Sequence, residues 1–219
     1  MQKILSLDCW GTLVKARESF WVDYSLMIKE LTNASASPAE IMHISKLINR
    51  DFDEKSNQNK KSYNQEDRLR ALVEVITENG SVQTGTLESI VCNIGVLIDS
   101  PQAYFNKLTD ELPKSVTKRY SKIVLCSNTG FISGTQTSKI LNKVGYDIFD
   151  AYFYSDAIDA PKPTRDFVEY LVAKLNLGDS LILEHFGDDP VCDNLTIHSN
   201  FIKSTILTNQ QALHSLLAT

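Results

Sequence analysis

The pattern of apolar and polar residues predicts a buried strand at the start of the chain and a different structure directly after it. Residues 4–7 form an apolar run that ends at Asp8, and Gly11 and Thr12 follow as turn residues. A run bounded in this way is typical of a β-strand that leads into a tight loop. From residue 17 to residue 98 the apolar positions recur at helical spacing instead, which predicts a bundle of helices.

Polar, turn-rich breaks divide this helical stretch at residues 33–38, 56–64 and 79–85. Beyond residue 100 the pattern alternates between strand and helix. Apolar runs predict strands at residues 122–127, 151–155, 181–186 and 203–207. Helical spacing, together with capping residues, predicts helices near residues 101–112, 133–144, 164–175, 190–199 and 209–217.

This order of elements predicts an α/β fold. Alternating strands and helices favour a parallel sheet with helices on both faces, and the helical stretch separates the first strand from the others. We therefore expect a Rossmann-like three-layer α/β/α core made of residues 1–13 and 100–219, with an all-helical cap domain inserted at residues 14–99. In such sheets ligands bind beyond the carboxyl ends of the strands.

Composition narrows the classes of partner. With 219 residues, 42% hydrophobic and 22% charged, the chain has the composition of a globular protein with one sizeable core. A net charge of −5 argues against nucleic acid as the main partner. The four cysteines are dispersed, and no apolar run resembles a signal peptide or a membrane span. We therefore expect a cytoplasmic protein with a small-molecule substrate and no membrane partner.

Polar residues gather where the predicted strands end. Asp8 ends the first strand, residues 127–129 (Ser-Asn-Thr) end the second, and residues 187–189 (Gly-Asp-Asp) end the fourth, while Lys162 lies in the loop after the third. Parallel strands bring these residues to one rim of the sheet. Carboxylates and an amine gathered in one place are costly unless they balance one another and serve a ligand.

These residues resemble the four signatures of the haloacid dehalogenase superfamily. The run at 8–13 (Asp-Cys-Trp-Gly-Thr-Leu) is similar to the first signature, and Ser127 after an apolar strand is similar to the second. Lys162 before a proline resembles the third, and Gly187-Asp188 with Asp193 five residues after Asp188 resembles the fourth. The four occur in order on the expected elements and cover nearly the whole chain.

The resemblance implies a hydrolase and assigns roles by position. Asp8 would be the nucleophile that forms a covalent aspartyl intermediate. Ser127 would donate a hydrogen bond to the transferred group, and Lys162 would neutralise charge on it. The loop residues beside these groups would line the substrate site: Trp10, Gly11, Thr12, Asn128 and Thr129.

The resemblance also implies a magnesium ion. Asp8, Asp188 and the backbone carbonyl of Trp10 would hold Mg²⁺ through hard oxygen ligands. Asp193 would support this set from behind or orient Lys162, and Asp189 is a further possible ligand. The acidic residues at 188–193 could also only favour a helix N-terminus, and His185 is expected to be a hydrogen-bonded structural residue.

One departure from the family pattern leaves the activity open. Phosphatases of the superfamily usually carry a second aspartate two residues after the nucleophile, as a general acid and base worth about 10²–10⁴ in rate, but here the residue is Trp10. The protein could be a Mg²⁺-dependent phosphatase in which another group protonates the leaving oxygen. It could resemble 2-haloacid dehalogenases, which have an aromatic residue at this position and an Asn corresponding to Asn128. It could also be a catalytically impaired protein that binds a phosphorylated ligand.

Overall fold

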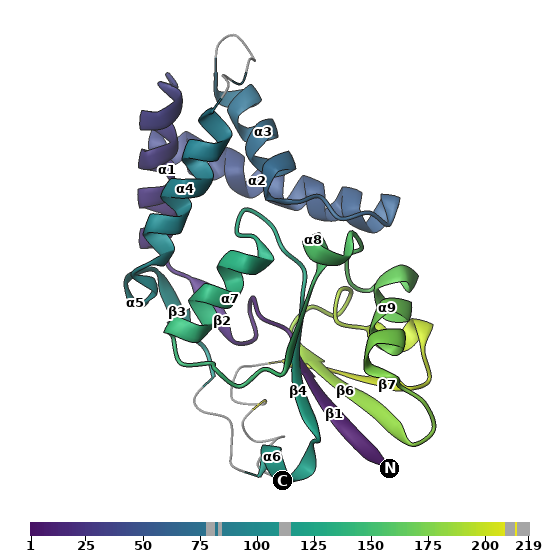
Figure 1. The fold of residues 1–219 in the computed structure, drawn as a ribbon. Helices are drawn as coiled ribbons and strands as arrows, with labels where there is room; N and C mark the ends of the chain where they lie inside the picture. The colour runs from purple at the N-terminus through teal and green to yellow at the C-terminus, as the bar shows by residue number, and fades with distance from the viewer. Residues whose placement is uncertain (78–81, 83–84, 110–114, 209–212, 214–219) are drawn as a thin grey trace. The chain divides into compact units, whose positions relative to one another are not determined.

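The computed structural model describes residues 1–77, 82, 85–109, 115–208 and 213, and its ribbon is drawn in Figure 1. Two compact units make up the chain. One contains residues 1–15, 107–128 and 145–219, and the other contains residues 16–106 and 129–144. Every helix in the described part of the chain is too short or too polar to cross a membrane.

The first unit is built on a five-stranded parallel sheet, in the order β5-β4-β1-β6-β7. Its strands are β1 (Gln2–Leu7), β4 (Lys122–Ser127), β5 (Ala151–Tyr154), β6 (Leu181–Gly187) and β7 (Ile202–Ile206). β1 lies in the centre (Figure 1), where Leu7 is aligned with Leu125 of β4 and Phe186 of β6. This register places the ends of β1, β4 and β6 at the same rim, as the sequence predicts.

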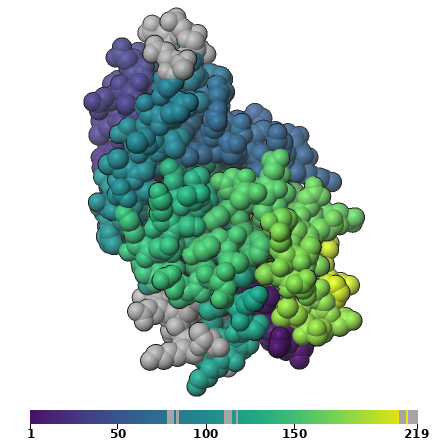
Figure 2. Space-filling model, viewed as in Figure 1, coloured from purple at the N-terminus to yellow at the C-terminus, as the bar shows by residue number. Residues whose placement is uncertain are grey.

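Helix α9 (Arg165–Leu175) supplies much of the core of this unit. Phe167, Val168 and Leu171 are buried on the helix face that packs with strand residues such as Ile4 and Leu183. The residues of α9 between them are exposed and form part of the outer surface, coloured light green in Figure 2. The parallel sheet with packed helices confirms the predicted α/β class. The same unit holds the short helices α6 (Val116–Arg119), α8 (Ser155–Ile158) and η1 (Leu195–His198).

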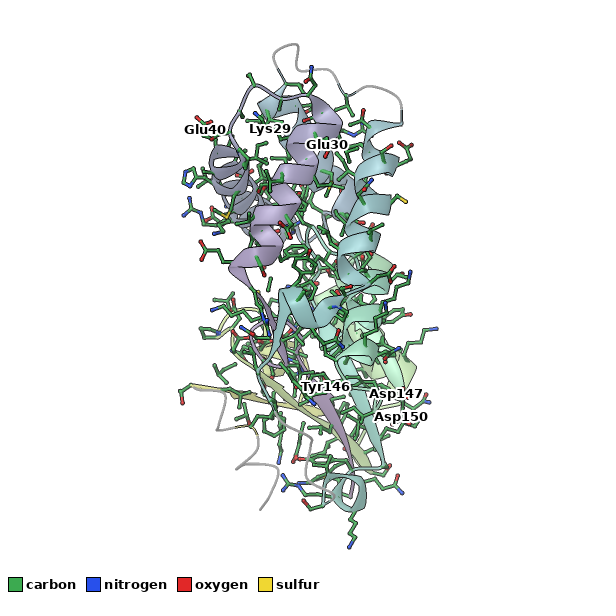
Figure 3. All side chains as sticks on the ribbon, turned by 90° about the vertical axis from the view of Figure 1, so that its left-hand side faces the viewer. Lys29, Glu30, Glu40, Tyr146, Asp147 and Asp150 are labelled. Atoms are coloured by element: carbon green, nitrogen blue, oxygen red, sulfur yellow. The ribbon has the colours of Figure 1, made fainter. Side chains whose placement is uncertain are left out.

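The second unit is helical, as predicted for the stretch after the first strand. It contains α1 (Glu18–Thr32), α2 (Pro38–Asn59), α3 (Gln65–Ile76), α4 (Thr86–Ile98), α5 (Pro101–Tyr104) and α7 (Gly134–Lys143). Capping boxes begin α2, α3 and α7, at Ser37, Asn64 and Ser133. Lys29 near the end of α1 (Figure 3) donates to the carbonyls of Ala34 and Ala36, which stabilises the turn into α2.

The compact units do not follow the expected domain limits of 14–99. Residues 100–106 and 129–144 also belong to the helical unit, so the chain leaves the sheet directly after Asn128. Gln65 of α3 explains part of this grouping, because its amide donates to the carbonyl of Phe131 (2.6 Å) and to Gln136 of α7 (2.7 Å). That the helical unit acts as a cap stays a prediction.

Two predicted helices are wrong. The helix expected at 101–112 ends at Tyr104, because residues 105–107 form strand β3 (Phe105–Lys107), which pairs with an unpredicted strand β2 (Val14–Ala16). The helix expected at 190–199 is a turn followed by η1, because the Asp189 carboxylate accepts hydrogen bonds from the backbone of Val191 and Cys192. The helix expected at 209–217 lies outside the described residues except for residue 213.

Candidate active site

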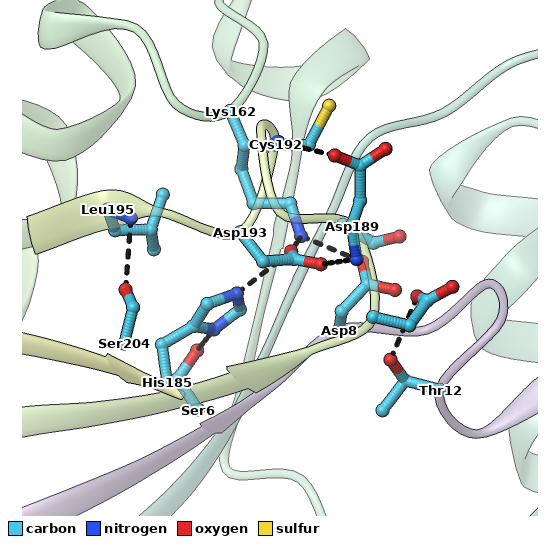
Figure 4. Close-up of polar contacts among 12 residues, drawn as sticks. Ser6, Asp8, Thr12, Lys162, His185, Asp189, Cys192, Asp193, Leu195 and Ser204 are labelled. Carbon is cyan, nitrogen blue, oxygen red and sulfur yellow. Dashed lines mark hydrogen bonds and ion pairs between the residues drawn. The ribbon is translucent and has the colours of Figure 1, made fainter. Parts of the chain in front are cut away.

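A buried ion-pair cluster lies at the end of β1 (Figure 4). Lys162 Nζ is 2.7 Å from Oδ1 of Asp8 and 2.5 Å from Oδ1 of Asp193, and all three side chains are buried. Asp8 and Lys162 lie 154 positions apart in the sequence. The structure thus brings together the carboxylate, the amine and the distal aspartate expected from the first, third and fourth signatures.

The loop after β1 is shaped so that Asp188 can approach it. Hydrogen bonds from the backbone of Leu13 and Val14 to the carbonyl of Cys9 close a tight turn, in which Gly11 has a φ of 86°. A Cβ at Gly11 would collide with the Asp188 carboxylate, so a glycine is needed here for both φ and space. Thr12 donates from Oγ1 to Oδ1 of Asp188 at 3.2 Å, and its expected place in the substrate site stays a prediction.

The turn after β6 holds Asp193 in a similar way. Gly187 has no room for a Cβ because the Asp193 carboxyl group lies against it. The backbone N–H of Asp189 donates to Oδ2 of Asp193 at 2.9 Å, and the N–H of Asp193 donates back to the carbonyl of Asp189. The side chain of Asp189 accepts from the two N–H groups that follow in the turn, which gives it a turn-capping role.

Asn128 fixes the loop that carries Lys162. Its Oδ1 accepts from the Lys162 backbone N–H at 2.7 Å, and its Nδ2 donates to the Lys162 carbonyl at 3.1 Å. Thr164 then caps α9, since its Oγ1 accepts from the N–H of Phe167. Both polar atoms of the Asn128 side chain are therefore used to hold the lysine backbone, a role that the sequence did not suggest.

Burial and mutual charge set the protonation of this cluster. Burial raises the pKa of Asp8 from 3.8 to about 7, opposed by Lys162 and reinforced by the Asp193 carboxylate. Burial disfavours the ammonium of Lys162, yet the carboxylates of Asp8 and Asp193 outweigh it and raise the lysine pKa. Burial also acts to raise the pKa of Asp193, but Lys162 and His185 lower it well below its usual range. The cluster therefore holds a charged lysine and an ionised Asp193. Too little positive charge surrounds Asp8 for its carboxyl group to ionise as readily as it does in water.

Asp188 adds a further carboxylate to this negative surplus. Partial desolvation raises its pKa, opposed by the hydrogen bond from Thr12. Carboxylate oxygens of Asp8, Asp188 and Asp193 lie within 4.8 Å of one another. Hard oxygen donors with surplus negative charge suit Mg²⁺. Both oxygens of Asp193 are already engaged by Lys162, His185 and the Asp189 backbone, so Asp8 and Asp188 are the better direct ligands.

The remaining predicted site residues have other surroundings. Ser127 is buried, and its hydroxyl donates to the carbonyl of Asn128 at 3.2 Å. Thr129 belongs to the helical unit. Trp10 is half-buried and pairs through its backbone with Val14. The roles of Ser127, Thr129 and Trp10 toward substrate or metal stay predictions.

His185 and Ser6 were missed as neighbours of the site. His185 is hydrogen bonded, as expected of a structural histidine, but one of its two partners is Asp193. The other is Ser6, a polar residue between the apolar residues Leu5 and Leu7 of β1. The sequence signal of this pair was limited to a serine within one predicted strand and a histidine within another.

Comparison with known proteins identifies the fold. Neither a protein-family model nor a curated protein sequence matches the chain. A HAD-hydrolase of Bacillus subtilis bound to magnesium matches it over 100% of this chain and 99% of its own, with 13% identity and a TM-score of 0.63. A 2-haloacid dehalogenase of Pseudomonas syringae pv. Tomato covers 100% and 99% of the two chains, with 14% identity and a TM-score of 0.61.

A predicted phosphoglycolate phosphatase of Haemophilus somnus is also similar, over 95% of this chain and 86% of its own, with 15% identity and a TM-score of 0.56. The chain therefore has the fold of the haloacid dehalogenase superfamily of hydrolases, and the fold expected from the four signatures is confirmed. The names of these structural neighbours include both a phosphatase and a dehalogenase, so the shared fold does not assign a reaction to this chain.

Proposed function

We propose that this protein is a Mg²⁺-dependent phosphatase that acts on a small phosphorylated metabolite. One observation carries the proposal: Lys162, with 1% of its side chain exposed, bridges Asp8 and Asp193 beside the carboxylate of Asp188. A single ammonium cannot neutralise these carboxylates, and a buried surplus of negative charge is costly. A divalent cation would remove the surplus and would leave Asp8 ionised for attack.

In the first step, an oxygen of Asp8 attacks the phosphorus atom while the bond from phosphorus to the leaving oxygen breaks. This forms an aspartyl phosphate on Asp8. Lys162 holds the attacking carboxylate and offsets the charge that develops on the phosphoryl oxygens. Bound Mg²⁺ would be held by Asp8, Asp188 and the Trp10 carbonyl and would neutralise the same oxygens. The Ser127 hydroxyl would turn from the Asn128 carbonyl to donate its hydrogen bond to the transferred group.

In the second step, water attacks the phosphorus atom, which releases inorganic phosphate and regenerates Asp8. Because the indole of Trp10 is no acid, the leaving oxygen takes its proton from solvent or from the substrate itself. We therefore expect a preference for substrates whose leaving group has a conjugate acid of low pKa, such as aryl phosphate esters or acyl phosphates. Trp10→Asp should increase the hydrolysis of alkyl phosphates by up to about 10²–10⁴-fold, because it adds general acid catalysis.

A 2-haloacid dehalogenase is the second candidate, favoured by Trp10 and by Asn128. A halide leaves as a stable anion, so this reaction needs no acid at position 10. Two observations favour the phosphatase instead. Both side-chain polar atoms of Asn128 are hydrogen bonded to the Lys162 backbone. The surplus carboxylates would also repel a haloacid anion unless a cation were present.

A substrate panel tests these alternatives. Purified protein is assayed with phosphate esters, including aryl phosphates and 2-phosphoglycolate, and with 2-haloacids, each with Mg²⁺ or with EDTA. Phosphate release that requires both Mg²⁺ and Asp8 supports the proposal. Halide release in EDTA that is lost in Asp8→Asn would replace it with the dehalogenase. Binding of a phosphorylated ligand without any turnover would indicate the third alternative, a binding protein with an impaired site.

A further inference from the structure

A chain of buried hydrogen bonds extends from the reacting carboxylate into the interior of the sheet (Figure 4). Lys162 joins Asp8 to Asp193, as described above. His185 Nε2 lies 3.0 Å from the same Oδ1 of Asp193, and His185 Nδ1 lies 2.8 Å from the hydroxyl of Ser6. Ser6 and His185 are fully buried on the adjacent strands β1 and β6.

The chemistry of the partners fixes the direction of these bonds. An ionised Asp193 can only accept, so the proton of the imidazole must lie on Nε2. Nδ1 of the neutral ring is then an acceptor, and Ser6 is the donor to it. Each polar atom of His185 thus has one partner of the required kind, and the ring is held in one tautomer and one orientation.

His185 and Lys162 form hydrogen bonds to the same carboxylate oxygen of Asp193. Oδ1 of Asp193 receives both His185 and Lys162, while Oδ2 is held by the backbone of Asp189. Without the donor at Nε2, the Asp193 carboxyl group could turn about its Cβ–Cγ bond toward the lysine alone. A shift of this kind moves the ammonium relative to Asp8, and small displacements of a catalytic group reduce rates strongly.

We propose that His185, oriented by Ser6, is a positioning residue for the reaction, acting through Asp193 on the ammonium of Lys162. It contacts neither substrate nor metal in this role. The proposal rests on the proposed function, since Lys162 must act on the transferred group for its position to affect the rate. If His185 only filled space in the core, the rate would not depend on a hydrogen-bond donor at the position of Nε2.

Two substitutions of similar polarity separate these roles. In His185→Gln the side-chain amide can place a donor where Nε2 lies, which keeps the bond to Asp193. In His185→Asn the shorter amide reaches the position of Nδ1, which keeps Ser6 but loses Asp193. We expect kcat of His185→Gln to stay close to that of the wild type, while kcat of His185→Asn falls about 10- to 100-fold with little change in KM.

Turnover of an aryl phosphate with Mg²⁺ is measured well below the unfolding midpoint of every variant, so that each is fully folded. If both variants lose activity equally, or if the loss in His185→Asn appears in KM alone, the positioning role is wrong. Ser6→Ala serves as a third variant. It leaves the Asp193 bond in place and should lower kcat less than His185→Asn does.

A readout that needs no turnover separates failure of this inference from failure of the proposed function. The ammonium of Lys162 is buried and doubly bonded, so its protons should exchange slowly and give a ¹⁵N-correlated NMR signal that Lys162→Arg removes. The signal should persist in His185→Gln and broaden or vanish in His185→Asn. Equal signals in the two variants would overturn the inference. Absence of phosphatase activity in the wild type would overturn only the function.

Discussion

Among the residues that the structure describes, each unit buries the side chain of one cationic residue to a similar degree, and the surroundings of the two cations differ. Lys162 in the sheet unit is 1% exposed, and Arg68 in the helical unit is 2% exposed. Arg68 donates to the carbonyls of Asn49 and Tyr63, to Oδ1 of Asn49, and to the carboxylate of Asp53, which is 54% exposed. The guanidinium is thus bonded to three neutral acceptors and to one solvated carboxylate.

Lys162 is instead bonded to two buried carboxylates, those of Asp8 and Asp193, and the carboxylate of Asp188 lies close to these two. The arginine cluster is balanced in charge, whereas the lysine cluster is too negative. Balanced buried groups stabilise a fold and need nothing else. A surplus buried charge is retained where a ligand or a reaction removes it. The comparison thus supports the proposal that the lysine cluster, and not the arginine cluster, is the functional site of this protein.

The largest expected difference between the two clusters is in turnover. Asp8→Asn removes the proposed nucleophile with almost no change in shape, and we expect kcat to fall by about 10⁴-fold or more. Asp53→Asn makes the same chemical change beside Arg68 and should leave kcat unchanged. Steady-state hydrolysis of an aryl phosphate measures both. Comparable losses in the two variants would remove the basis for the distinction.

A smaller difference is expected in stability. Lys162→Met leaves Asp8 and Asp193 buried without their cation, and we expect it to lower the free energy of unfolding by about 3–5 kcal/mol. Arg68→Met leaves only one solvated carboxylate and several carbonyls, so its cost should be about 1–3 kcal/mol. Urea denaturation without metal measures both values. A larger cost at Arg68 would contradict the charge argument.

The pH dependence of stability should also reveal the surplus charge. The pKa of Asp8 is raised from 3.8 to about 7 by burial, so the folded state binds more protons than the unfolded state between these values. The contribution of Asp8 is present below pH 3.8 and is lost as the pH rises to about 7. Burial lowers the pKa of His185, which contributes in the opposite sense below pH 6.5 in every variant, so the Asp8 contribution is measured as the difference in slope between metal-free wild type and Asp8→Asn. Asp8→Asn, or saturating Mg²⁺, should remove the Asp8 contribution in urea titrations.

The smallest expected effect concerns the side-chain amides of Asn128, which bonds to the Lys162 backbone, and Asn49, which bonds to Arg68. Asn128→Ala removes both bonds to the Lys162 backbone and should cost about 1–3 kcal/mol, with a drop in kcat because the lysine loop is loosened. Asn49→Ala removes a bond to Arg68 and should cost a similar amount with kcat intact. Turnover per folded molecule, together with urea denaturation, checks this pair. A fall in kcat for Asn49→Ala alone would reverse the assignment.

Much of the sheet could be predicted because its signals are local. The apolar runs that became β1, β4, β5, β6 and β7 are short and bounded by turn residues, and their register places Asp8 and Asp188 at one rim. The helix expected at 190–199 failed because the side chain of Asp189 bonds the local backbone in a turn. The prediction of a helix at 101–112 was wrong because β3 pairs with β2, a strand that lies far earlier in the chain.

The sequence by itself determined which residues end the strands, the identity of the signature residues and the capping of the helices, because each of these depends on neighbours a few positions away. Only the tertiary structure decided what those residues do for one another. It placed Asn128 on the backbone of Lys162, joined Ser6 to His185 across 179 positions, and assigned residues 129–144 to the helical unit. Such bonds depend on the distance between atoms after folding, and no local pattern along the chain records that distance.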